Sequence, residues 1–106
     1  MLEPTFPIAA QKTASMLGDL WTRKRPVVEE RLTILECAAT GPLTEPLRVQ
    51  ARDVAHKLAG SLGMFGFPQG TEIARELELI LESPSPDPAS IGRLTTQLRQ
   101  ILFPQS

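Results

Sequence analysis

The chain has 106 residues, so we expect one domain with a modest core. Its 11 basic and 12 acidic side chains give a formal net charge of -1, which predicts no preference for nucleic acid or an anionic membrane. Its one cysteine and one histidine exclude an internal disulfide and leave too few ligands for a zinc site. No apolar stretch approaches the roughly 20 residues that span a bilayer, and the N-terminus lacks the apolar segment of a signal peptide, which predicts a cytoplasmic protein.

Apolar residues recur with helical spacing along the chain, and no segment shows the alternation expected of a strand. Residues 1–12 include two prolines and are expected to form a loose lead-in, after which Thr13 is the candidate cap of a helical segment. Pro26 is expected to break or kink that segment and to open a second helix, which ends at Gly41. The inward residues predicted for these two segments are Met16, Leu17, Leu20, Trp21, Val28, Leu32, Leu35 and Ala39.

A third helix is expected from about Thr44 to a turn at residues 64–67, and a fourth helix follows that turn. The proline-rich segment 83–88 separates the fourth helix from a last one, for which Asp87 is the expected cap. The apolar stripes of these three helices comprise Leu47, Ala51, Val54, Ala55, Leu58, Leu62, Ile73, Leu77, Ile80, Leu81, Ile91, Leu94, Leu98, Ile101 and Leu102. Short loops between amphipathic helices predict an all-α fold, an antiparallel up-down four-helix bundle over about residues 13–103 with an additional N-terminal helical segment.

The histidine of the chain, His56, is predicted to face away from the core, because at about 100° per residue the apolar stripe of its helix lies roughly 160° to 260° away from it. Gly60 and Gly63 lie within about 60° of the histidine on the wheel, although a glycine inside a helix costs roughly 0.5 to 1 kcal/mol relative to alanine. We interpret the two glycines as clearance that lets another protein approach an exposed imidazole. The other residues predicted on this docking face are Val49, Arg52, Asp53 and Ala59.

Two simpler interpretations of this face remain open on the sequence alone. An exposed histidine on a helix is usually a solvated residue without a further role. Gly60 and Gly63 would also let a neighbouring helix pack closely, although their position opposite the apolar stripe argues against this.

The segment from Ala55 to Phe67, together with the later Leu77 and Glu78, resembles the signature of histidine-containing phosphotransfer (HPt) domains. That signature has histidine, any residue, leucine, lysine and glycine, then small residues, glycine-phenylalanine and a later leucine-glutamate. The helices on either side fit the rest of an HPt bundle, so the resemblance covers nearly the whole chain.

The resemblance implies a role for several residues. His56 would be the phosphoacceptor, Gly60 would open the docking surface, and Glu78 would orient the imidazole by a hydrogen bond. Ala59 departs from the pattern, because many members have a lysine there that is thought to favour the incoming phosphoryl group. Lys57 or Arg52 are the candidates to supply this positive charge instead.

The resemblance also implies a function. The chain would accept and donate a phosphoryl group between His56 and the aspartate of response-regulator receiver domains in a two-component phosphorelay. A histidine kinase or hybrid kinase would be the other partner, and magnesium would be held by the receiver. The chain itself would need no cofactor or metal and would be a phosphocarrier rather than an enzyme, because it has no glycine loop for a nucleotide. We expect a monomer that forms one domain, residues 1–106, of a larger protein.

Two other functions are compatible with a small helical domain. The first is a protein-interaction module without phosphoryl chemistry, whose glycine-lined face docks a partner helix. The second is the dimerisation and phosphoacceptor domain of a sensor kinase. Domains of that second class typically follow the histidine with an acidic residue and a proline, whereas Lys57 and a series of glycines stand here.

Overall fold

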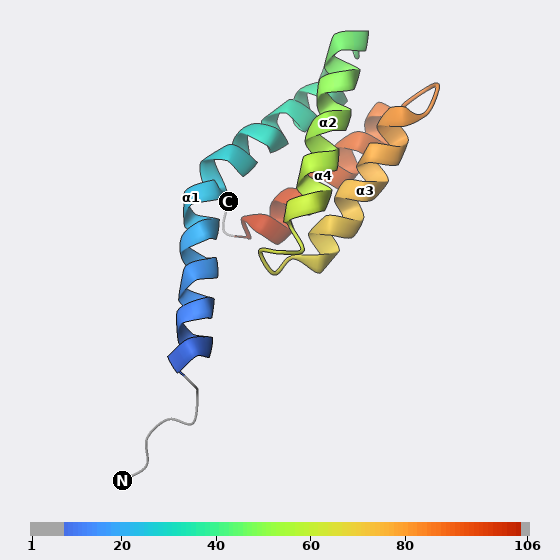
Figure 1. The fold of residues 1–106 in the computed structure, drawn as a ribbon. Coiled ribbons are helices and arrows are strands. Elements are labelled where there is room, and N and C mark those ends of the chain that lie inside the picture. Colours follow the sequence, from blue (N-terminus) through green and yellow to red (C-terminus); the bar gives the residue numbers. More distant parts are fainter. Residues whose placement is uncertain (1–7, 105–106) are drawn as a thin grey trace.

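The computed structural model describes residues 8–104, and it describes side chains from Gly18 onward. Within these residues the chain forms helices and no strand (Figure 1): α1 (Ile8–Thr40), α2 (Glu45–Ser61), α3 (Pro68–Glu82) and α4 (Pro88–Leu102). The predicted all-α class is therefore confirmed. None of the helices in the described range combines the length and apolar character that crossing a bilayer requires.

The helices pack as a bundle in which each lies beside two others. α1 contacts α2 and α4, and α3 also contacts α2 and α4, so the four helices close into a ring around one core (Figure 1). The core consists almost entirely of aliphatic side chains, with Leu32, Leu35, Leu58, Leu77 and Leu98 fully buried. The predicted stripes of α2, α3 and α4 line this core, although some of their members are only half-buried.

Local signals set the starts of α2 and α4 as predicted. The hydroxyl of Thr44 accepts a hydrogen bond from the backbone N–H of Leu47 at 3.3 Å, and the carboxylate of Asp87 accepts one from the N–H of Ser90 at 3.3 Å. Each satisfies a backbone donor that the first helical turn leaves without a partner. Gly66 ends the turn after α2 with a φ of 91°, a conformation that glycine adopts without strain.

The first helix differs from the prediction in two ways. It already begins at Ile8, so residues 8–12 are helical instead of belonging to a loose lead-in, because alanine, glutamine and lysine are good helix formers. It also continues through Pro26 instead of ending there, although it bends along its course (Figure 1). Contacts hold the chain on both sides of the proline, since Trp21 packs against aromatic rings and Val28 enters the core.

Among the inward residues predicted for α1, Val28, Leu32 and Leu35 are buried as expected. Leu20 is 39% exposed and was predicted wrongly, because α1 turns the neighbouring Trp21, and not Leu20, toward the rings of Phe65, Phe67 and Phe103. Met16 and Leu17 lie outside the residues whose side chains are described.

An aromatic cluster closes the end of the bundle where α2 turns into α3. The ring of Trp21 lies 5.7 Å from Phe65, 4.9 Å from Phe67 and 5.9 Å from Phe103, measured between ring centroids. The guanidinium of Arg25 lies 5.3 Å from the ring of Phe103, within the range of a cation-π interaction. This cluster fixes α1 next to the turn that follows the histidine helix.

Candidate functional site

The site is built around His56, which lies in the middle of α2. Its side chain is 74% exposed, so the prediction that it faces away from the core is confirmed. The imidazole Nδ1 lies 2.8 Å from the Oε2 atom of Glu78 on α3, and the Glu78 side chain is 22% exposed. The structure thus brings together the two residues that the resemblance paired, across 22 residues of sequence.

This contact decides which imidazole nitrogen can react. An ionised carboxylate only accepts hydrogen bonds, so the nitrogen that faces Glu78 carries the proton. In the neutral ring the lone pair then belongs to Nε2, because the two nitrogens of a neutral imidazole share one proton. The contact therefore fixes the orientation of the ring and leaves Nε2 as the nucleophilic atom of an exposed side chain.

The two glycines near His56 differ in their surroundings. A Cβ placed on Gly60 would meet no atom within 4 Å outside its own helix, so the surface one turn after the histidine is open as predicted. Gly63 lies beyond the end of α2, and a Cβ there would stand 3.3 Å from the Oγ1 atom of Thr71 on α3. Gly63 is exposed, but it lies in the turn after the helix and close to α3, so the surface there is less open than at Gly60.

Ala59, which was predicted on the docking surface, is 9% exposed and belongs to the core. The reason is the antiparallel pairing of α2 with α3. Since His56 meets Glu78 and Gly63 meets Thr71 two turns further along, Ala59 lies in between, against the middle of α3. The buried arc of α2 is therefore wider than its apolar stripe predicts.

The remaining predicted residues lie at different edges of the site. Asp53 is exposed and Val49 is half-buried. Arg52 has its Nη2 atom 3.2 Å from the Oδ1 atom of Asp53, so this cation already has a partner. Lys57 is exposed and lines hollows between α1 and α2, on the side away from α3.

Two exposed residues of α3 lie close to Glu78 along the helix. Leu79 directly follows Glu78 and is 68% exposed. Arg75 lies one turn before Glu78 and is exposed, as its outward place on the predicted helix implies.

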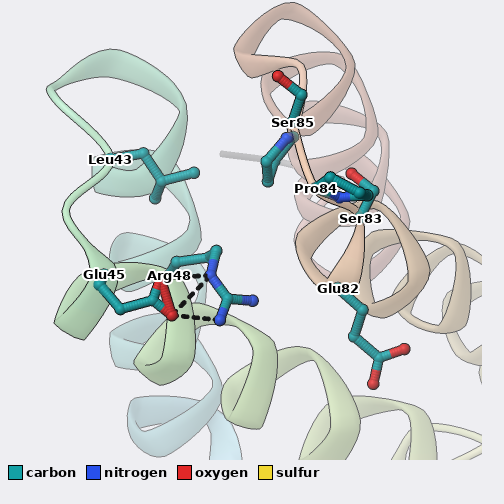
Figure 2. Close-up of a pocket in the computed structure, with 8 residues that line it drawn as sticks. Leu43, Glu45, Arg48, Glu82, Ser83, Pro84 and Ser85 are labelled. Carbon is teal, nitrogen blue, oxygen red and sulfur yellow. Dashed lines mark hydrogen bonds and ion pairs between the residues drawn. The ribbon is translucent and has the colours of Figure 1, made fainter.

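Another hollow, with a volume of 510 Å³, lies between the start of α2 and the loop after α3 (Figure 2). Two of its charged residues, Arg48 and Glu45, form an ion pair. The guanidinium of Arg48 donates to Glu45 and, at 2.8 Å, to the carbonyl of Leu81. The hydrogen bond from Arg48 lowers the pKa of the Glu45 carboxyl and raises the pKa of Arg48. This hollow is therefore a structural joint between α2 and α3, separate from His56.

No cluster of three potential metal-binding side chains occurs among those that the structure describes. The reactive group of the site is one oriented imidazole, which is exposed on α2 one turn before the uncovered backbone of Gly60. Such a group is a nucleophile.

The chain is similar to a known domain family and to one curated protein. The model of a family described as Hpt domain matches residues 25–102, a range that runs from the bend of α1 to the end of α4. Protein RcaC of Microchaete diplosiphon is 40% identical over 72 residues, which are 64% of this chain and 11% of that protein. The chain therefore spans only a small part of the length of this relative. No solved structure matches the chain.

Proposed function

This chain belongs to the Hpt domain family, and on that premise we propose that the Nε2 atom of His56 accepts a phosphoryl group from the aspartate of a receiver domain and passes it to another. The observation that carries the proposal is the exposed imidazole whose Nδ1 is held by Glu78. A phosphoryl donor on a second protein can reach the nucleophile only if the ring is at the surface. A fixed ring also loses less entropy when the two proteins meet.

The proposed transfer is a displacement at phosphorus. The Nε2 lone pair forms a bond to the phosphorus of the aspartyl phosphate while the bond to the carboxylate oxygen breaks, and the carboxylate leaves. The phosphorylated ring retains its Nδ1 proton, and its positive charge is stabilised by the Glu78 carboxylate at 2.8 Å. Donation to the next receiver is the reverse reaction, so the same geometry serves both directions.

The partner supplies the rest of the chemistry in this proposal. The receiver contributes the aspartate and a divalent metal ion, expected to be magnesium, which neutralises charge on the transferred group. A histidine kinase or hybrid kinase introduces the phosphoryl group upstream. The chain described here contributes the nucleophile, its orientation and the open surface at Gly60, so it acts as a carrier.

The proposal is tested by mixing the purified chain with a panel of receiver domains charged with radiolabelled acetyl phosphate and magnesium. We expect label on this chain that is labile in acid and stable in base, as phosphohistidine is. The label should be absent from His56→Gln and present in Glu76→Gln, a control at an exposed position of α3. Label that survives in His56→Gln, or wild-type protein that no receiver labels, would contradict the proposal. Partner binding that needs no phosphorylation would then favour a plain interaction module.

A further inference from the structure

The surface on either side of the histidine helix is electrically asymmetric. On the α3 side, Glu78 and the exposed Glu82 lie next to α2, with Arg75 as an exposed cation of the same helix. On the α1 side a hollow of 280 Å³ lies between α1 and α2, and its lining contains cations and no carboxylate. The lining residues are Lys24, Val27, Val28, Arg31, Lys57, Ser61, Met64 and Phe65.

This hollow, which we call the α1–α2 groove, combines positive charge with apolar surface. Val27 is 38% exposed and Met64 is 61% exposed, so both contribute apolar surface to the lining. Lys24 and Arg31 lie two turns apart on the same face of α1, and Lys57 lies opposite them on α2. A partner surface that fits the groove would therefore present apolar side chains flanked by carboxylates.

The groove adjoins the reactive residue through Lys57, and His56 itself is not part of its lining. Lys57 directly follows His56, and Ser61 continues the same side of α2 one turn later. A second hollow of 340 Å³ shares Val27, Arg31 and Lys57 with it and extends the depression toward two carboxylates, Glu30 and Asp53, so the positive charge is confined to the first hollow. A protein that reaches the histidine thus covers at least part of this groove.

We propose that the α1–α2 groove receives the acidic rim of the receiver domain and orients the receiver over His56 from the α1 side. The inference rests on the proposed function, which supplies the occupant: the face of a receiver that delivers phosphate carries an aspartate and the carboxylates that hold its metal ion. Three cations attract such a face. Glu78 and Glu82 on the α3 side repel it, so the receiver settles asymmetrically.

The test uses the full chain and the receiver domain that labels it fastest. Lys24→Glu and Arg31→Glu reverse charges in the groove without touching the reacting ring, and Arg93→Glu reverses an exposed charge on α4 as a matched control. Transfer is followed in single turnovers with the phosphorylated receiver in excess. We expect each groove variant to raise the half-saturating receiver concentration about tenfold while the limiting rate stays unchanged. Arg93→Glu should behave like the wild type.

Salt provides a second measurement that does not depend on a substitution. Raising ionic strength should increase the half-saturating concentration of the wild type and have a much smaller effect on the double variant Lys24→Gln, Arg31→Gln. Thermal melting checks that the variants are folded. The inference would be overturned if the half-saturating receiver concentration of the groove variants stayed within about twofold of the wild-type value, or if Arg93→Glu raised it as much as they do. A wild-type chain that no receiver labels would instead contradict the proposed function.

Discussion

The hydrogen bond between Glu78 and His56 controls the state of the imidazole, and its loss should be visible without any partner. Replacing Glu78 with Gln removes the carboxylate that holds the Nδ1 proton at 2.8 Å. We expect the population with the proton on Nε2 to rise, because the amide can donate to Nδ1 as well as accept from it. Nitrogen NMR of the imidazole measures this directly, since the chain has 1 histidine.

The same substitution should slow phosphoryl transfer from a receiver by about tenfold, the loss expected for one hydrogen bond to a charged group. Glu76→Gln, at an exposed position of the same helix, is the control for a general effect on α3. If Glu78→Gln transfers at the wild-type rate with an unchanged tautomer ratio, the carboxylate has no part in orienting the ring.

Gly60 offers a residue at which stability and transfer should change in opposite directions. A Cβ there meets no atom within 4 Å, so Gly60→Ala should raise the free energy of unfolding by about 0.5 to 1 kcal/mol through its better helix propensity. The added methyl group narrows the surface beside His56, so the receiver should bind less well and transfer should slow. Chemical denaturation and single-turnover transfer measure the two effects.

Gly66 provides the contrast for this experiment. Its φ of 91° is strained for any side chain, so Gly66→Ala should lower the free energy of unfolding by about 1 to 2 kcal/mol. A loss of stability in Gly60→Ala as well would show that the surface at Gly60 is covered, against the geometry described above.

At the scale of elements, the sequence predicts features that depend on neighbouring residues. The caps at Thr44 and Asp87 are of this kind, because a side chain next to a helix start satisfies the donors of that same helix. The exposure of His56 also follows from the spacing of α2 alone. Of the two outcomes predicted for Pro26, a break or a kink, the break is wrong, because contacts with distant parts of the chain outweigh the local cost of the proline and α1 continues as a bent helix. The burial of Ala59 likewise depends on the pairing of α2 with α3.

In the site, too, the features that depend on contacts between helices could not be predicted from local sequence. Glu78 could be connected with His56 only through resemblance to a family, because nothing in the periodicity of α3 indicates which residue of α2 it meets. The α1–α2 groove was not predicted at all, since its cations come from two helices whose relative rotation is a property of the assembled bundle.

The start of α4 should make a small contribution to stability that depends on pH. The hydrogen bond from the Ser90 hydroxyl at 2.8 Å, with those from the backbone, lowers the pKa of the Asp87 carboxyl below its ordinary value of 3.8. A lowered folded-state pKa stabilises the protein above the unfolded-state pKa, and this contribution is lost as the pH falls through the folded-state value. Asp87→Asn can still cap the helix but does not titrate.

The melting temperatures of wild type and Asp87→Asn should therefore be compared between pH 7 and pH 3. We expect the melting temperature of the wild type to fall more over this interval than that of Asp87→Asn, because protonation weakens the helix cap only in the wild type. Other carboxyls titrate equally in both proteins and cancel in the difference. Parallel curves would show that the charge of Asp87 adds nothing to its role as a cap.

Across the whole molecule, one residue ties the last helix to the first. Arg99 on α4 binds Glu36 on α1 through two hydrogen bonds, Nε to Oε2 at 2.8 Å and Nη2 to Oε1 at 3.1 Å. Its Nη1 also donates to Glu29 at 2.5 Å. These contacts, chiefly the one with Glu36, raise the pKa of Arg99, so the guanidinium stays charged at any pH at which the bundle is folded. The pair joins residues that are 63 positions apart in the chain.

A double-mutant cycle measures what this tie contributes to the closed bundle. We expect Arg99→Met and Glu36→Gln to be coupled by about 0.5 to 1 kcal/mol, at the upper end for exposed pairs because the geometry is bidentate. Urea is the suitable denaturant, since guanidinium chloride screens ion pairs. The cycle of Glu36→Gln with Arg93→Met, an exposed residue on the same helix, should be additive. Additivity in the first cycle would mean that the contact between Arg99 and Glu36 adds nothing to the joining of α1 and α4 beyond apolar packing and the contact of Arg99 with Glu29.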